Sequence, residues 1–255
     1  MMKHLLQHTL LASAAVSATL SATSLPARAA DDTTVVLVHG AFADGSSWGK
    51  VIPLLQAKGV KVVAVQNPLS SLADDVSAAR KAIDAQPGKV VLVGHSWGGA
   101  VITQAGDSDK IKALVYVAAF APSEGETLGT VGKDYPVPPG VPSLKPDAAG
   151  YLTLSEASYA ANFAQDIPAA TAKAYAATQG LFPARAFDEK ITYAAWKSKP
   201  NYYIVASNDR MISPDLERAF AKKLNAVTTV LASSHVPMLS QPQKVADVIL
   251  AAVKR

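Results

Sequence analysis

The sequence predicts an α/β protein, with a mostly parallel sheet of about six strands, helices on both faces and one long helical insertion. Three observations support this class. Apolar runs of five to eight residues recur along the chain, and most are followed by a stretch with helical periodicity. The runs are apolar throughout, as expected for strands buried on both faces. A chain of 255 residues without repeats or linker-like stretches can also bury one large core.

The first 29 residues are set apart from this fold. Lys3 gives a basic start, an Ala- and Leu-rich stretch runs from about Leu10 to Leu20, and Ala27-Arg28-Ala29 precedes two acidic residues. These three parts, in this order, are typical of a secretory signal peptide. A membrane anchor is the alternative, but the apolar stretch is short for a spanning helix of about 20 residues. We expect cleavage after Ala29 and a periplasmic or secreted protein.

The composition narrows the partners of the remaining chain. Beyond residue 29 it carries 22 basic and 20 acidic side chains, a net charge of +2, with no basic cluster. Nucleic acid and membrane surfaces are therefore not expected partners. The chain has no cysteine, which excludes disulfides, thiol catalysis and cysteine-ligated metals.

Strands and helices are predicted in alternation. The strands are Thr34 to Val38, Val60 to Val65, Lys89 to Val93, Ile111 to Ala118, Tyr202 to Ala206 and Val227 to Leu231. Helical patterns cover Ser47 to Ala57, Leu72 to Ala85, Gly98 to Ala105, Pro214 to Leu224 and Pro242 to Val253. This alternation predicts a parallel sheet with right-handed crossovers.

Residues 122–199 interrupt the alternation. They hold eight of the sixteen prolines and nine of the seventeen aromatic residues. A stretch of this length is not a mere loop in a compact domain. We expect a small, mostly helical cap over the carboxyl edge of the sheet, where open α/β folds bind ligands. The core domain would then consist of residues 30–121 and 200–255. A subdomain that only packs its own core is the alternative.

Ser96 is the candidate nucleophile. Gly94-His95-Ser96-Trp97-Gly98 fits the pattern G-x-S-x-G and lies between a predicted strand and a predicted helix. In that context the serine occupies a tight turn with its hydroxyl exposed above the sheet, and the flanking glycines avoid collisions with neighbouring backbone. A glycine-rich structural turn is the alternative.

A serine hydroxyl needs a base to act as a nucleophile. Beyond residue 29 the chain has only His39, His95 and His235. His95 adjoins Ser96, and consecutive side chains diverge at a sharp turn, so we expect it to support the turn. His39 ends the first strand and suits a structural hydrogen bond. His235, in the loop after the last strand, is the predicted base.

The base in turn needs a carboxylate. Asp209 follows the strand Tyr202 to Ala206 and stands between Ser96 and His235 in chain order, as this architecture requires. Asp215 and Glu124 are the competitors, and an ion pair with Arg210 is the structural alternative for Asp209.

An oxyanion hole and an apolar pocket complete the predicted site. The backbone N–H of Trp97 is one expected donor, and the N–H of Ala41, or else of Phe42, is the second. The aromatic residues expected over Ser96 are Phe42, Trp97, Tyr135, Tyr159, Phe163, Phe182 and Trp196, with Tyr151 as a further cap aromatic.

These motifs resemble the α/β-hydrolase family. "VLVHGAFADGSSWGKVIPLLQAKGVKVVAV", "GHSWGGAVI", "LVYVAAFAP", "SNDRMI" and "HVPMLSQPQKVADVI" are similar to the branch of plant methylesterases, hydroxynitrile lyases and their bacterial esterase-like relatives. The resemblance implies a Ser96–Asp209–His235 triad, a cap, no metal and no organic cofactor. Hydroxynitrile lyases carry a lysine after the triad histidine, where this chain has Val236.

We therefore expect a serine hydrolase that cleaves a small carboxylic ester or lactone with an apolar moiety, through an acyl-enzyme intermediate. Two other classes compete with this hypothesis. One is a non-catalytic binding protein on a hydrolase fold, which has no need of Ser96, Asp209 and His235 together. The other is a hydroxynitrile-lyase-like enzyme, which Val236 disfavours.

Overall fold

Six parallel strands form the central sheet, in the order β2-β1-β3-β4-β7-β8. They are β1 (Thr34–Val38), β2 (Lys61–Val65), β3 (Val90–Ser96), β4 (Ile111–Ala119), β7 (Asn201–Ala206) and β8 (Val227–Leu231). The computed structural model describes residues 32–255, and the predicted signal peptide lies outside them. All six predicted strands are present, with ends within three residues of the prediction.

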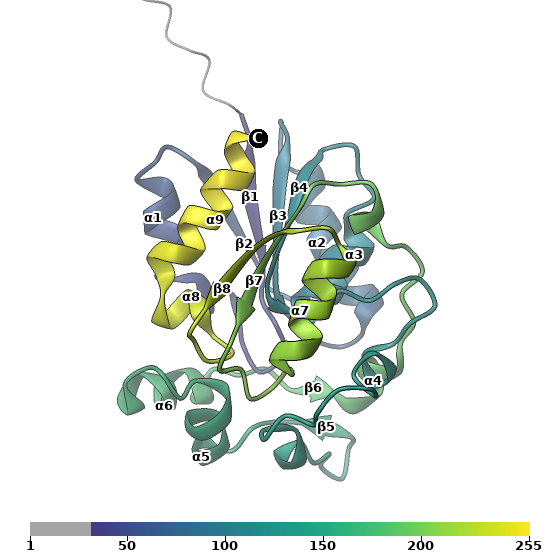
Figure 1. Ribbon diagram of the computed structural model, residues 1–255, viewed down its shortest axis with the longest axis vertical. Helices are drawn as coiled ribbons and strands as arrows, with labels where there is room; N and C mark the ends of the chain where they lie inside the picture. The colour runs from purple at the N-terminus through teal and green to yellow at the C-terminus, as the bar shows by residue number, and fades with distance from the viewer. Residues whose placement is uncertain (1–31) are drawn as a thin grey trace, which may run out of the picture. The chain divides into compact units, whose positions relative to one another are not determined.

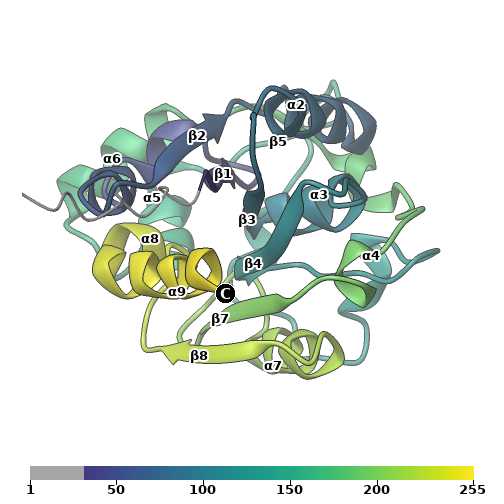
Figure 2. The same ribbon diagram turned by 90° about the horizontal axis from the view of Figure 1, so that it is seen from above.

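Helices cover both faces of the sheet (Figure 2). One face carries α1 (Ile52–Gln56), α8 (Pro237–Ser240) and α9 (Pro242–Lys254), and the other carries α2 (Leu72–Asp84), α3 (Trp97–Ala105) and α7 (Pro214–Lys223). Every residue of β1 and β3 is buried between these layers, whereas the outer strands β2 and β8 are partly exposed. This is the burial that a parallel sheet with both faces covered requires.

The helical stretch predicted at Ser47 to Ala57 is shorter and divided. A turn of 3-10 helix spans Gly45–Trp48, and α1 begins only at Ile52. Pro53 explains the boundary, since proline has no N–H to donate and is tolerated only in the first turn of a helix.

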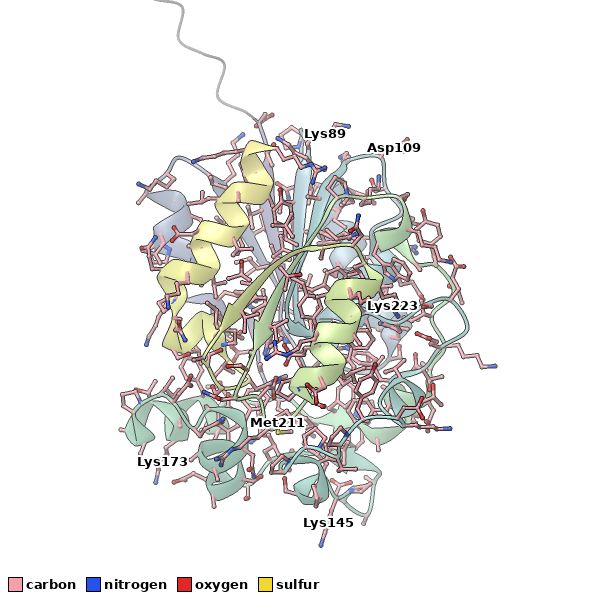
Figure 3. The ribbon with its side chains drawn as sticks, in the orientation of Figure 1. Lys89, Asp109, Lys145, Lys173, Met211 and Lys223 are labelled. Atoms are coloured by element: carbon pink, nitrogen blue, oxygen red, sulfur yellow. The ribbon has the colours of Figure 1, made fainter. Side chains whose placement is uncertain are left out.

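Residues 122–199 connect β4 to β7 and lie across the carboxyl ends of the strands (Figure 1). They contain α4 (Leu128–Val131), α5 (Glu156–Ser158), a π-helical turn (Tyr159–Phe163) and α6 (Ala169–Ala177). They also contain an antiparallel pair, β5 (Tyr151–Leu152) and β6 (Phe182–Pro183), which the sequence does not predict. Lys145 and Lys173 point outward from this insertion, whereas Met211 lies where it meets the sheet (Figure 3).

No helix in residues 32–255 is long and apolar enough to cross a membrane.

Candidate active site

Ser96 occupies a strained turn between β3 and α3. Its φ of 53° and ψ of −121° lie in a region that non-glycine residues avoid, at a cost of about 1–3 kcal/mol. A Cβ at Gly94 would lie 2.4 Å from the Gly98 carbonyl oxygen, and one at Gly98 would lie 2.6 Å from the Val38 carbonyl oxygen. Glycines are therefore required at both positions, as the sequence pattern predicts. Persistent strain of this kind is typical of functional sites.

His235 and Asp209 form a buried pair beside this turn. His235 lies in the loop after β8 and Asp209 in the loop after β7, and both side chains are almost fully buried. His235 Nδ1 donates a hydrogen bond to Asp209 Oδ2 at 2.5 Å. This bond orients the imidazole ring through Nδ1. The second ring nitrogen, Nε2, is buried and has no hydrogen-bond partner among the described residues. Nε2 is therefore the nitrogen that can accept a proton.

The second oxygen of Asp209 is fixed by backbone. Asp209 Oδ1 accepts hydrogen bonds from the amides of Met211, at 2.6 Å, and Ile212, at 3.0 Å. Hydrogen bonds to a charged carboxylate are short and strong, so these two amides hold the Asp209 side chain in a fixed orientation. Arg210 does not form the alternative ion pair with Asp209, which pairs with His235, and its Nη1 donates to the Ala161 carbonyl oxygen at 2.9 Å.

The competing carboxylates lie elsewhere. Glu124 accepts hydrogen bonds from the Ala194 amide, at 3.2 Å, and from Lys197 Nζ, at 2.7 Å. Asp215 stands in the first turn of α7, where a negative charge complements the helix dipole. Of the three candidates, Asp209 is the one hydrogen-bonded to His235.

The other two histidines are buried and hydrogen-bonded to backbone groups. His95 is fully buried, and its Nε2 donates to the His235 carbonyl oxygen at 2.8 Å. Burial lowers the pKa of His95 well below its usual value, so the ring stays neutral. His39 accepts from the Asn67 amide at Nε2, at 2.9 Å, and donates from Nδ1 to the Gly40 carbonyl oxygen, at 2.8 Å.

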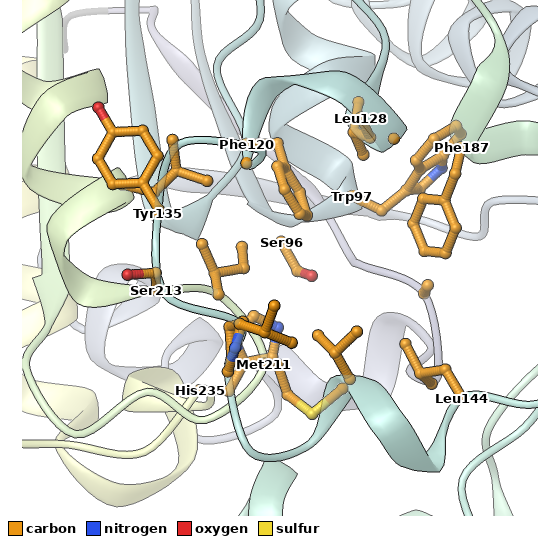
Figure 4. Close-up of a pocket in the computed structure, with 18 of the residues that line it drawn as sticks. Ser96, Trp97, Phe120, Leu128, Tyr135, Leu144, Phe187, Met211, Ser213 and His235 are labelled. Atoms are coloured by element: carbon orange, nitrogen blue, oxygen red, sulfur yellow. The ribbon is translucent and has the colours of Figure 1, made fainter.

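Ser96 and His235 share one pocket of about 350 Å³. In Figure 4 the Ser96 hydroxyl points into the space between Phe120, Trp97 and Met211. Apolar side chains form most of the wall. Of the residues predicted for the site, Ala41, Phe42, Ser96, Trp97, Tyr135, Phe163 and His235 lie on this wall.

Three predicted pocket residues do not line the cavity. Phe182 is fully buried, with its ring centroid 4.9 Å from that of Trp97, so it packs behind the wall. Tyr159 is likewise buried, against Phe163 at 4.6 Å. Trp196 donates its indole N–H to the Pro122 carbonyl oxygen and stacks under Lys223, away from the cavity. Packing inside the insertion decides these positions, and composition does not reveal it.

Several wall residues were missed by the sequence analysis. They are Phe120, Leu128, Leu144, Phe187, Met211, Ile212 and Leu216. A signal existed for three of them, because Phe120 directly follows β4 and Met211 and Ile212 follow the predicted acid. Residues just beyond the carboxyl ends of parallel strands meet at the ligand-binding edge.

The predicted oxyanion donors flank the serine. Trp97 is the first residue of α3, whose leading N–H groups have no partner within the helix. Ala41 and Phe42 follow β1 and line the same cavity, and Phe42 has a φ of 59°. The assignment of the second donor to Ala41 or Phe42 stays a prediction.

No cluster of three or more His, Asp or Glu side chains suited to a metal ion occurs in residues 32–255. The described site consists instead of a serine, a histidine and a carboxylate.

Comparison with known proteins identifies a family and several relatives that this chain resembles. A model of the "Alpha/beta hydrolase family" matches residues 35–248. Methylesterase 2 of Arabidopsis thaliana is 28% identical over 254 residues, covering 85% of this chain and 94% of the relative. The alpha-hydroxynitrile lyase of the same plant is 27% identical over 248 residues, covering 85% and 95%. The crystal structure of a pyrethroid hydrolase from Sphingobium faniae JZ-2 matches with a TM-score of 0.72 at 23% identity, covering 87% of this chain and 98% of that chain.

Proposed function

The chain belongs to the alpha/beta hydrolase family, and from this premise we propose that it is a serine esterase for small, neutral esters or lactones with an apolar moiety. One observation carries the proposal: a serine on a strained turn shares an apolar pocket with a histidine that is hydrogen-bonded to a buried carboxylate. This set of groups supplies a nucleophile, a base and a group that orients the base.

In the proposed mechanism, Ser96 Oγ attacks the ester carbonyl carbon while His235 Nε2 accepts the hydroxyl proton. The Asp209 carboxylate stabilises the imidazolium that forms. The backbone N–H groups of Trp97 and of Ala41 or Phe42 receive the negative charge that develops on the carbonyl oxygen. His235 then returns the proton to the leaving alcohol. Water then attacks the acyl carbon while His235 Nε2 accepts its proton, and His235 returns that proton to Ser96 Oγ as the bond to the serine breaks and the carboxylic acid leaves.

The pocket supports an apolar and uncharged substrate. The polar side chains on its wall are Ser96, Tyr135, Ser213, His235 and the exposed Lys133, and the other wall residues are apolar or small. Burying an apolar group there contributes about 25 cal/mol per Å², whereas a charged group would lose its hydration, and the one lysine on the wall, Lys133, is itself exposed to solvent. The names of the relatives, a methylesterase and a pyrethroid hydrolase, are consistent with hydrolytic chemistry.

The lyase alternative has less support. Val236 is buried and carries no charge, so the position after His235 offers nothing to stabilise a departing cyanide. A pure binding protein has no use for the buried Asp209–His235 pair. Probe labelling and ester hydrolysis distinguish both alternatives from the proposed esterase.

The test is labelling of the purified protein with a fluorophosphonate probe, together with hydrolysis of p-nitrophenyl esters. We expect the probe on Ser96, turnover of short esters, and loss of nearly all turnover in Ser96→Ala. Ser108→Ala, in the turn after α3, is the matched control and should keep wild-type rates. A label on another residue, or full activity in a folded Ser96→Ala protein, would overturn the mechanism. Binding of an ester without turnover would favour the binding protein, and release of cyanide from a cyanohydrin would favour the lyase.

A further inference from the structure

Glu217, on α7, is a fully buried carboxyl group that the proposed mechanism does not use. Its Oε2 accepts a hydrogen bond from the Ala206 amide, at the end of β7, at 2.9 Å. Its Oε1 is buried, and no donor group among the described residues reaches it. A buried carboxyl oxygen without a partner is costly. Some other interaction must therefore satisfy it.

The Glu217 carboxyl group lies beside the turn that carries Asp209, because the Ala206 amide donates to Glu217 Oε2 and the Ala206 carbonyl oxygen accepts from the Asp209 amide at 3.1 Å. Asp209 already receives three donors, from Met211, Ile212 and His235. A carboxylate offers about four lone-pair positions, so one is left for Glu217. Two carboxyl groups can share a hydrogen bond only if one carries a proton. Asp209 faces three N–H donors and Glu217 faces one, so the proton belongs on Glu217.

The electrostatic surroundings agree with this placement. Burial, followed by the negative charge of Asp209, raises the pKa of Glu217 well above its usual value. The Arg218 guanidinium acts in the opposite direction but is a smaller influence. Tyr203, the other titratable group that interacts with Glu217, is itself fully buried, and its hydroxyl donates to the Ala119 carbonyl oxygen. Its pKa is raised, so it adds no charge.

We propose that Glu217 is a positioning residue of the Asp209–His235 pair, whose protonated carboxyl group donates the fourth hydrogen bond to the Asp209 carboxylate. It anchors that carboxylate to the end of β7 through the Ala206 amide. The carboxylate then cannot rotate away from His235 Nδ1 when the imidazole ring gains a proton. This inference rests on the proposed function for its effect on turnover. The hydrogen bond itself can be tested without turnover.

Two substitutions separate the hydrogen bond from simple packing. Glu217→Gln keeps an oxygen for the Ala206 amide and an N–H for Asp209, and it should keep kcat within about threefold of wild type. Glu217→Leu keeps the bulk and removes both bonds. Because a small misplacement of catalytic groups can cost up to about 100-fold, we expect kcat to fall by about 10- to 100-fold in this variant, with KM nearly unchanged.

A spectroscopic readout reports on the pair directly. The proton between His235 Nδ1 and Asp209 gives a far-downfield proton NMR resonance, assigned by its loss in His235→Gln. We expect this resonance to move or broaden in Glu217→Leu and to stay in place in Glu217→Gln. Thr103→Val is the control for a purely structural role. It removes another buried hydrogen bond, to the Tyr116 hydroxyl at 2.9 Å, and should lower the melting temperature without moving the resonance or kcat.

Wild-type kcat and an unmoved resonance in Glu217→Leu would overturn the proposal, as would a Glu217→Gln variant as impaired as Glu217→Leu. If Glu217→Leu does not fold, the carbon NMR signal of the Glu217 carboxyl group, assigned by its absence in Glu217→Gln, decides. At neutral pH it should show the protonated form, and an ionised form overturns the proposal. A wild-type protein that hydrolyses no ester contradicts the proposed function alone, because both NMR measurements still test Glu217.

Discussion

Asp75, in the first turn of α2, accepts a hydrogen bond at Oδ2 from the indole nitrogen of Trp97 at 2.7 Å. Its other oxygen accepts from the Leu69 amide at 2.8 Å. Trp97 follows Ser96 directly and lines the pocket, and its ring also packs on Phe182 of the insertion. A single buried carboxyl group on α2 therefore holds the side chain that joins the serine turn to the insertion.

This arrangement predicts an unusual pH dependence of stability. Burial raises the pKa of Asp75 from 3.8 to about 6. The native protein then binds the proton more tightly than the unfolded chain, so stability falls as the pH rises from about 4 to about 6. The shift corresponds to a loss of about 3 kcal/mol. We expect urea unfolding of wild type and Asp75→Asn to show this loss in the wild type only.

Asp74 provides a control with the opposite sign. Hydrogen bonds from Ser70 and Ser71 lower its pKa. Its ionised form therefore stabilises the native state, and this contribution is lost as the pH falls through the acid range. Relative to Asp74→Asn, the wild type should gain stability as the pH rises. Parallel pH curves for wild type and Asp75→Asn would contradict the role given to Asp75.

Asp209→Asn tests the acid of the proposed site. An asparagine in place of the carboxylate can stabilise the wrong tautomer of His235, and a comparable change in one Ser-His-Asp enzyme lowers kcat by about 10⁴. We expect a loss of several orders of magnitude in ester hydrolysis. Glu124→Gln and Asp215→Asn are the controls and should stay near wild type, since neither carboxylate is hydrogen-bonded to His235. A crippled Glu124→Gln would mean that the acid follows β4 instead.

The strands and the core of the site could be predicted because they depend on local patterns. An apolar run buried on both faces looks the same wherever it lies in the chain. The sequence G-x-S-x-G between a strand and a helix specifies one kind of turn. His235 is then the histidine that remains once His39 and His95 are assigned structural roles, and Asp209 follows a strand between Ser96 and His235 in chain order. The ends of β3 could not be placed, because the strand continues through Gly94 and His95 to Ser96 itself.

The wall of the pocket could not be predicted, because it depends on which side of the insertion each ring faces. Phe163 and Phe182 are both buried aromatic residues of the insertion, yet only Phe163 reaches the cavity. Glu217 and Asp75 are buried carboxyl groups that the sequence analysis did not single out. Glu217 is spaced three, four and seven residues from Phe220, Ala221 and Leu224, all of them buried. The helical periodicity therefore already placed the Glu217 carboxylate on the apolar face of the predicted helix, which indicates a buried carboxyl group.

The predicted signal peptide can be tested separately. Expressed as the full chain in a Gram-negative bacterium, the protein should appear in the periplasmic fraction or the medium, with its N-terminus at Ala30. The physical reason is the order of basic, apolar and small residues in the first 29 positions. Intact-mass measurement of the purified protein gives the answer. An uncleaved chain recovered from the cytoplasm would contradict the export hypothesis.

Tyr135 and Phe182 separate binding of substrate from packing of the insertion. Tyr135 lines the cavity and is only partly buried. Its ring can bury apolar surface of a bulky ester but has little to bury with an acetate. We expect Tyr135→Ala to raise KM for a long or aromatic ester by about tenfold, equivalent to about 1.4 kcal/mol, and to leave the melting temperature nearly unchanged. Tyr135→Phe keeps the ring and should behave like wild type.

Phe182 predicts the opposite pattern, because it is fully buried behind the wall. Phe182→Ala removes contacts with Trp97 and Phe187, and buried Phe→Ala changes cost about 3–5 kcal/mol of unfolding free energy. Its melting temperature should fall, and kcat/KM should fall by one common factor for short and long esters. If both variants lost stability without a change in ester preference, these rings would serve only to pack the insertion. The apolar moiety of the substrate would then have to bind against Phe120, Met211 and Leu128.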